Sequence, residues 1–244
     1  MNDSDLLALM YDFYNNHLLK GQNDDINYYI NFIKENSLKD ILVVGAGTGR
    51  IAIPLSTYAN VTALDFDESR LKLLNSKCCN IEIVCENLLN YKNNKSFDLI
   101  IIPYSTFQFD NDEKQMELML KKILGIMNNQ TVLLIDMSES FVNKKDQRKI
   151  LLFSDYCSEI DDNVEVYYSA KKFKNYIEFN VEYKFIRLNK TVIENERYYY
   201  YNECVLSKML IDNDLEILKV DNGYGKSGFE HKHLYHCRRK NGRI

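Results

Sequence analysis

The stretch from residue 40 to residue 65 constrains the fold of this chain more than any other. An apolar run at residues 41–44 opens into Gly-Ala-Gly-Thr-Gly-Arg at residues 45–50, and a second apolar run ends at Asp65. A turn from a buried strand into a helix needs backbone angles that glycine adopts freely. The order strand, glycine turn, helix, strand and acid is typical of a βαβ nucleotide-binding unit.

The residues after the glycines favour a helix. Ile51, Ala52 and Leu55 keep apolar groups at helical spacing, and Pro54 falls in the first turns, where its missing N–H is tolerated. Asp65 then ends the next strand, at the edge of the sheet where the glycines lie. Its carboxylate is therefore a natural acceptor for two ribose hydroxyls.

The spacing of the glycines separates two classes of ligand. A dinucleotide fingerprint, G-x-G-x-x-G, needs glycine at position 50, where this chain has Arg50. Glycine stands at position 49 instead, and the resulting G-x-G-x-G resembles motif I of the class I S-adenosylmethionine-dependent methyltransferases. An NAD-type fold and a loop that binds no nucleotide remain alternatives.

The order of the later elements agrees with this resemblance. Strands are predicted at residues 81–85, 96–102 and 131–136, with an amphipathic helix over 113–127. The resemblance implies an α/β fold with a Rossmann-like, seven-stranded, mostly parallel sheet. Helices would cover both faces, the last strand would be antiparallel, and an antiparallel β lid would be inserted.

The resemblance also implies which residues contact the cofactor, S-adenosyl-L-methionine, and its product S-adenosyl-L-homocysteine. Asn87 occupies the place of a polar side chain that binds the adenine amino group, and its amide oxygen can accept that hydrogen bond. In related enzymes the N-terminal helix carries a Tyr-Asp pair and a later tyrosine and folds over the cofactor, and this chain has Tyr11-Asp12 and Tyr14 there. The implied cofactor contacts are Tyr14, Gly45, Ala46, Gly47, Gly49, Arg50, Asp65, Phe66, Asn87, Leu88, Pro103 and Tyr104.

The turn after the fourth predicted strand, at residues 103–108, should face the sulfonium and the acceptor. The predicted catalytic residues are Tyr14, Tyr104, Thr106 and Gln108, and the predicted acceptor contacts are Tyr11, Phe107, Tyr199 and Tyr200.

Two positions depart from the family pattern. Val43 stands where the family usually has an acid that holds the methionine end of the cofactor. Ser105 replaces an arginine that is frequent in the small-molecule branch. The role of that arginine does not carry over to this chain.

The segment from residue 163 to 201 alternates aromatic and β-branched residues with polar ones, which indicates antiparallel strands. It resembles the lid of small-molecule methyltransferases, including sugar-amine and peptide N-methyltransferases. The expected organisation is one domain over residues 1–244. Its parts are a helical cap at 1–37, a cofactor-binding core at 38–140, the lid at 160–201, and the last helix and strands at 202–244.

Composition sets the outer limits. The chain has 244 residues, 45% of them hydrophobic, and a net charge of −4, which argues against broad nucleic-acid binding. No long apolar run or signal peptide is evident, so a cytoplasmic protein without membrane contact is expected. The six cysteines show no metal spacing, and no metal is expected. The oligomeric state is left open.

The predicted reaction is methyl transfer to a small molecule or short peptide. An amine acceptor is favoured because no unmistakable base is present; the candidate proton acceptors are His17, Asp136, Glu139 and Glu230. The alternatives are an O-methyltransferase or a transferase with a modified sulfonium donor, an inactive cofactor-binding protein, and an NAD-type oxidoreductase.

Overall fold

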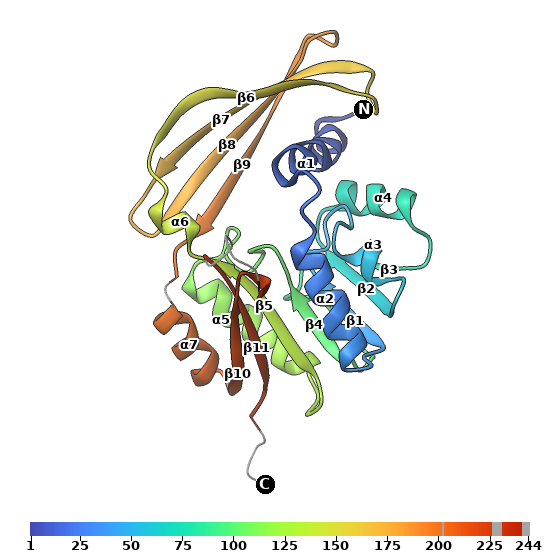
Figure 1. Ribbon diagram of the computed structural model, residues 1–244, viewed down its shortest axis with the longest axis vertical. Coiled ribbons are helices and arrows are strands. Elements are labelled where there is room, and N and C mark those ends of the chain that lie inside the picture. The colour runs from blue at the N-terminus through green and yellow to red at the C-terminus, as the bar shows by residue number, and fades with distance from the viewer. Residues whose placement is uncertain (202, 226–230, 241–244) are drawn as a thin grey trace. The chain divides into compact units, whose positions relative to one another are not determined.

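The computed structural model describes residues 1–201, 203–225 and 231–240. The chain forms two compact units, each described here by itself (Figure 1). The small unit contains Met1–Gln22 and Phe141–Tyr200, and the core unit contains Asn23–Ser140 and Tyr201–Ile244. The expected cap at residues 1–37 is therefore divided, because its two helices belong to different units.

The core unit is built on a seven-stranded sheet in the order β10-β11-β5-β4-β1-β2-β3. Neighbours from β5 to β3 are parallel, whereas β11 runs antiparallel to both β5 and β10. The predicted mostly parallel sheet with an antiparallel last strand is confirmed. The strands are β1 (Asp40–Val44), β2 (Asn60–Asp65), β3 (Glu82–Cys85), β4 (Leu99–Ile102), β5 (Val132–Ser138), β10 (Leu215–Asn222) and β11 (Lys232–Arg239).

Burial on both faces explains the sequence of the central strands. In β4 all four residues are buried, and β1 is buried from Ile41 onward. A parallel strand covered by helices on both sides reads as a continuous apolar run, as these two strands do. The parallel register places the ends of β1, β2, β4 and β5 at one edge of the sheet.

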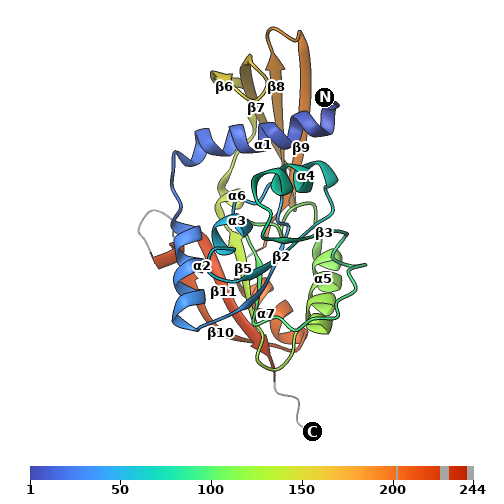
Figure 2. The same cartoon turned by 90° about the vertical axis from the view of Figure 1, so that its right-hand side faces the viewer.

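Five helices belong to the core unit, within the residues that the structure describes: α2 (Asp24–Glu35), α3 (Ala52–Leu55), α4 (Glu68–Lys77), α5 (Glu113–Ile126) and α7 (Glu203–Asp212). Helices α2, α3 and α4 pack on one face of the sheet in one apolar cluster. Figure 2 shows α5 on the other side of the sheet from α2. Asp67 and Asp112 cap α4 and α5 by accepting backbone N–H bonds at 3.0 and 2.9 Å.

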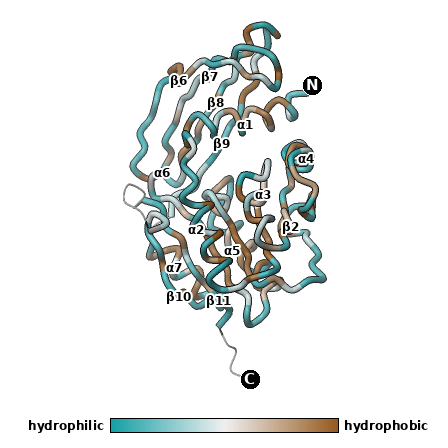
Figure 3. Tube along the Cα trace, turned by 45° about the vertical axis from the view of Figure 1, so that its right-hand side comes forward, coloured by the Kyte–Doolittle hydropathy of each residue, from teal (hydrophilic) through white to brown (hydrophobic). Residues whose placement is uncertain are grey.

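The small unit packs α1 (Asp3–Leu19) against a four-stranded antiparallel sheet in the order β6-β7-β8-β9. Leu6 and Met10 of α1 join buried strand residues such as Val166 and Tyr183 in a second core. Figure 3 shows hydrophobic residues along the first half of α1. The strands are β6 (Gln147–Cys157), β7 (Asp162–Lys172), β8 (Tyr176–Phe185) and β9 (Lys190–Tyr199), and α6 (Ser140–Asn143) precedes them.

The predicted lid boundary at residue 160 was too late, because the sheet begins at Gln147. Strand β6 contains four consecutive apolar residues at 150–153 and no clear alternation. Its pairing with β7 has two register irregularities, before Ile150 and after Leu151. A bulge breaks the two-residue period, so the alternation that identified the later strands is absent here.

Across the helices of the described residues, none is long and apolar enough to span a membrane.

Candidate cofactor site

Each of the three glycines after β1 has a positive φ, but their surroundings differ. The values are +71° at Gly45, +54° at Gly47 and +93° at Gly49, a region that side chains rarely adopt. A Cβ on Gly45 would lie 2.4 Å from Thr106 Cγ2, and one on Gly49 would lie 2.8 Å from Ile53 Cδ1. Close packing therefore excludes a side chain at the first and third glycines.

Gly47 differs because a Cβ built there would meet nothing within 4 Å. The middle of the loop thus faces open space at the carboxyl edge of the sheet, as a main-chain cradle for a ligand should. Its N–H donates to Asp65 Oδ2 at 2.7 Å, and Asp67 N–H donates to Asp65 Oδ1 at 3.0 Å. These two bonds orient the carboxylate at the end of β2, beside the loop. Asp65 therefore lies beside the glycine loop, at the same edge of the sheet, and these residues fit a nucleoside ligand; their contacts with the cofactor stay predictions.

Val43 stands at the position where the family usually has an acid, and its side chain is fully buried in β1. The next charged side chain after Val43 is that of Arg50, a predicted cofactor contact. Its guanidinium pairs in bidentate fashion with Asp25 in the first turn of α2, with one N–O distance of 3.2 Å. Both side chains are largely buried. Asp25 was not predicted as a site residue. Its one signal in the sequence is that it is an acid in the first turn of a predicted helix, a common position for an acid.

The segment after β3 carries the residues predicted at the adenine. Asn87 is exposed, and its amide oxygen accepts the Leu89 N–H at 2.9 Å. Leu88 is buried, whereas Phe66, next to Asp65, is 67% exposed. An exposed phenylalanine beside the end of β2 offers an apolar face to a ligand. Contacts of these residues with adenine stay predictions.

The turn after β4 is held in a strained conformation. Tyr104 and Ser105 are consecutive non-glycine residues with φ of +52° and +61°. The Tyr104 N–H donates to Asp136 Oδ2 at 3.0 Å, and its ring lies 4.7 Å from the Arg50 guanidinium and 5.2 Å from Lys232 Nζ. Pro103, which begins the turn, is buried. The structure thus places the Arg50 guanidinium next to the Tyr104 ring, and the cofactor contacts of Arg50, Pro103 and Tyr104 stay predictions.

Three other residues of this turn, Thr106, Phe107 and Gln108, make contacts within the core unit. Gln108 is buried, donates to the Ser138 carbonyl at 3.0 Å and accepts the Ser138 N–H at 2.7 Å. These two hydrogen bonds hold the turn against the end of β5. Phe107 is fully buried, so the structure places its ring in the interior and not on an accessible acceptor surface. Thr106 packs against Gly45, and its catalytic part, like that of Gln108, stays a prediction.

Asp136 in β5 is fully buried. Tyr224 Oη donates to Asp136 Oδ2 at 2.5 Å, beside the Tyr104 N–H, while Oδ1 has no hydrogen-bond partner among the described residues. Burial raises the pKa of Asp136, and the nearby Lys232 partly opposes that shift. Asp136 is thus enclosed by the core unit, and its part as a proton acceptor stays a prediction.

The other candidate proton acceptors lie elsewhere. Glu139 follows β5, and its carboxylate faces His233 Nε2 at 3.5 Å. His17 belongs to the small unit, where it bonds to the Phe13 carbonyl at 2.8 Å and to Asp155 at 2.9 Å. Glu230 lies outside the described residues.

The predicted tyrosines of the small unit are half-buried. Tyr14 lies in α1 with its ring edge-on to Tyr183, 6.4 Å away, and burial raises its pKa. Tyr11 is one turn earlier in the same helix. Tyr199 ends β9 beside Tyr176, and the Tyr200 N–H donates to the Asn175 carbonyl at 2.8 Å. Their roles at the cofactor or acceptor stay predictions.

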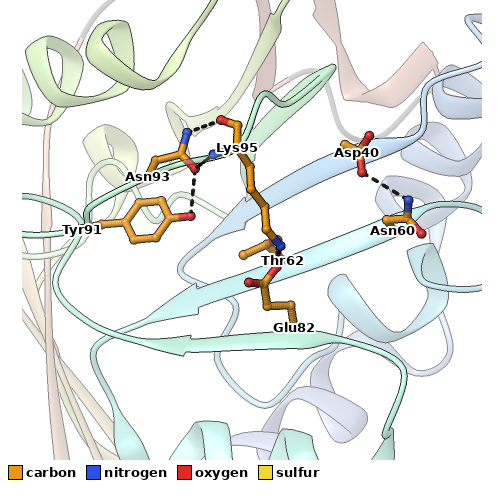
Figure 4. Close-up of polar contacts among 7 residues, drawn as sticks. All are labelled: Asp40, Asn60, Thr62, Glu82, Tyr91, Asn93 and Lys95. Atoms are coloured by element: carbon orange, nitrogen blue, oxygen red, sulfur yellow. Dashed lines mark hydrogen bonds and ion pairs between the residues drawn. The ribbon is translucent and has the colours of Figure 1, made fainter.

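A polar cavity lies at the opposite edge of the core sheet, where β1, β2 and β3 begin. It has a volume of about 230 Å³ and is lined by Asp40, Asn60 and Glu82, among others. Glu82 accepts from Lys95 and, at 2.8 Å, from Thr62 (Figure 4). These contacts satisfy the polar groups at the amino ends of the strands. No cofactor residue was predicted at this edge.

Residues 41–130 match the family model for a methyltransferase domain. This stretch of the chain is a methyltransferase domain. It contains the glycine loop, Asp65, Asn87 and the Tyr104 turn. The predictions of a methyltransferase and of the class I fold are confirmed, with S-adenosylmethionine as the cofactor of such a domain.

Solved structures share the fold of the methyltransferase domain and of the small unit. An S-adenosylmethionine-dependent methyltransferase from Clostridium acetobutylicum is 17% identical, with a TM-score of 0.80, and the match covers 95% of this chain and 98% of that one. The sugar N-methyltransferase KedS8 from Streptoalloteichus is 11% identical, with a TM-score of 0.77 and coverage of 95% and 93%. The amino pentose methyltransferase CalS10 from Micromonospora echinaspora is 13% identical, with a TM-score of 0.73 and coverage of 95% and 97%. A comparison with curated proteins gave no match.

Proposed function

We propose that this S-adenosylmethionine-dependent methyltransferase transfers the methyl group to an amine nitrogen of a small molecule or short peptide. The observation that carries the cofactor part is the open space at Gly47, next to a carboxylate already oriented at the end of β2. The amine part rests on the absence of an evident strong base and on the fold shared with a sugar N-methyltransferase and a glycopeptide N-methyltransferase.

The core unit supplies the groups that hold the cofactor. In this proposal the main chain at Gly47 contacts the methionine part, and Asp65 accepts hydrogen bonds from the ribose hydroxyls. Each oxygen of Asp65 already accepts one backbone N–H, which leaves further lone pairs for a ligand. Asn87 accepts from the adenine amino group, and the exposed Phe66 ring covers an apolar face of the nucleoside.

Arg50 and Tyr104 form the other side of the proposed site. The Tyr104 ring is held by two cations and its backbone by Asp136, so the turn keeps one conformation. When bound, the sulfonium of the cofactor supplies an electrophilic methyl group. A fixed turn contributes by orientation, because alignment of the attacking nitrogen with the methyl carbon provides much of the acceleration of such a displacement.

The acceptor must present a lone pair, and this favours an amine. A neutral amine needs only to release a proton, whereas a hydroxyl needs a stronger base or a metal. Among the described residues no group of three or more His, Cys, Asp or Glu is placed to hold a metal. Glu139, half-exposed after β5, is the carboxylate in the core unit that we propose takes the proton.

Calorimetry with S-adenosylmethionine, S-adenosylhomocysteine and NAD tests the cofactor part of the proposal. We expect wild type to bind the first two and not NAD, and Gly47→Arg and Asp65→Ala to lose that binding. A preference for NAD, or no binding at all, would refute it.

A panel of primary amines, secondary amines and alcohols, incubated with methyl-labelled cofactor, tests the acceptor part. Label transfer to amines supports the proposal. Transfer to alcohols alone would replace it with O-methylation, and binding without any transfer would indicate an inactive cofactor-binding protein.

A further inference from the structure

The turn at Tyr104 and Ser105 needs an external restraint. Tyr104 and Ser105 are consecutive non-glycine residues in the left-handed region, and such strained conformations persist only where the surroundings hold them. The Ser105 side chain does not supply the restraint, because its hydroxyl is buried with no hydrogen-bond partner among the described residues.

Asp136 is the group placed to supply it. One oxygen of this fully buried carboxylate accepts the Tyr104 N–H at 3.0 Å and the Tyr224 hydroxyl at 2.5 Å. Tyr224 lies after β10, in a short 3₁₀ turn (Gly223–Gly225), and itself has a φ of +55°. The carboxylate thus links three segments that are distant in the sequence: the turn after β4, the end of β5 and the turn after β10.

The position of this turn matters for the glycine loop as well. Thr106, two residues after Tyr104, fills the space in which a Cβ of Gly45 would lie. The Tyr104 ring is also in contact with Arg50, the residue that ends the glycine motif. A shift of the turn would therefore move both the packing partner of the first glycine and the neighbour of Arg50.

We infer that Asp136, held by Tyr224, is a positioning residue that fixes the Tyr104 turn in its cofactor-binding conformation. Asp136 does not touch the reacting atoms in this assignment; it acts through the Tyr104 backbone. The inference rests on the proposed function for the statement that the turn contacts the cofactor.

The test measures the dissociation constant of S-adenosylhomocysteine and, separately, hydrogen exchange of the Tyr104 amide by NMR. Asp136→Ala removes both hydrogen bonds, and we expect binding at least tenfold weaker and a fast-exchanging Tyr104 amide. Asp136→Asn keeps an oxygen that can accept both bonds, so it should stay within about threefold of wild type. Tyr224→Phe removes one of the two hydrogen bonds, so its dissociation constant should lie between those of Asp136→Ala and Asp136→Asn.

Tyr156→Phe is the matched control. Its hydroxyl also donates to a carboxylate, Asp161 at 2.6 Å, and both residues belong to the small unit. This variant should bind S-adenosylhomocysteine as wild type does and keep the Tyr104 amide protected.

The outcomes separate this inference from the proposed function. If wild type fails to bind S-adenosylhomocysteine, the proposed function fails, and the exchange of the Tyr104 amide still decides whether Asp136 fixes the turn. If Asp136→Ala is less stable in urea but its folded form binds with the wild-type constant, Asp136 has only a structural role and the inference is overturned. An Asp136→Asn variant as weak as Asp136→Ala would also overturn it.

Discussion

Substitution of Gly47 by alanine separates the ligand-binding reason for a glycine from the structural reasons. With φ at +54°, an alanine here is strained by about 1–2 kcal/mol, and its Cβ meets no atom within 4 Å. For a chain of this size 1 kcal/mol lowers the melting temperature by about 2–4 °C. We therefore expect Gly47→Ala to melt about 2–8 °C below wild type in the absence of ligand.

The effect on the cofactor should be much larger than the effect on stability. Ligand at about one hundred times its dissociation constant stabilises a protein by about 2.7 kcal/mol, which corresponds to an increase of about 5–10 °C in melting temperature. S-adenosylhomocysteine should give this increase with wild type. It should give none with Gly47→Ala, because the new methyl group occupies the space that the ligand needs.

Two other glycines provide the comparison. Gly21, between α1 and α2, has φ of +78° and equally open surroundings, so Gly21→Ala controls for backbone strain in open space. Gly45→Ala adds a contact of 2.4 Å with Thr106, and should be less stable than Gly47→Ala by about 1–3 kcal/mol of overpacking. Differential scanning fluorimetry with and without ligand gives all these values. If Gly47→Ala shows the wild-type increase with S-adenosylhomocysteine, the space at Gly47 is not the cofactor cradle.

Three further predictions concern stability. Asp25→Ala removes the carboxylate that faces the largely buried Arg50, and should lower the free energy of unfolding in urea by about 3 kcal/mol; an unchanged midpoint would contradict this. Ile101→Ala leaves a cavity in the fully buried β4 and should cost about 2–5 kcal/mol, whereas Leu118→Ala on the exposed side of α5 should change the midpoint little. Burial lowers the pKa of His236 from 6.5 to about 4, so the unfolded state binds a proton that the folded state resists. The free energy of unfolding should be highest above pH 6.5 and should fall by about 1–2 kcal/mol towards pH 4, after allowance for screening. The His236→Gln variant should not show the decline between about pH 6.5 and 5.

The sequence predicted the elements whose physical cause is local. Buried parallel strands are apolar runs, and the glycine turn and Asp65 follow them at fixed spacing, so β1, β2 and the carboxylate beside the loop were found directly. Strand β6 was missed because its bulges remove the two-residue period. The interior position of Phe107 could not be read from its neighbours, because burial of a turn residue depends on tertiary packing.

The contacts that hold the site come from residues distant in sequence, and no local pattern indicates them. Tyr224 meets Asp136 across 88 residues, and Asp25 meets Arg50 across 25. Each of these residues alone is an ordinary tyrosine or aspartate. Their relation exists only after the sheet order brings the end of β5 next to β11, and after α2 packs over the glycine loop.

The three glycines also explain why the spacing of this motif distinguishes ligand classes. Gly49 cannot carry a side chain because Ile53 and Leu74 fill its surroundings, so here the third glycine serves the packing of the helices that follow. Position 50 is thereby released from close packing, and Arg50 uses it to reach both Asp25 and the ring of Tyr104. A dinucleotide loop needs glycine at that position to bring its helix close to the strand beside a pyrophosphate. With a paired guanidinium there instead, the loop lacks the feature that a pyrophosphate requires, and the open main chain at Gly47 is left for a ligand without one.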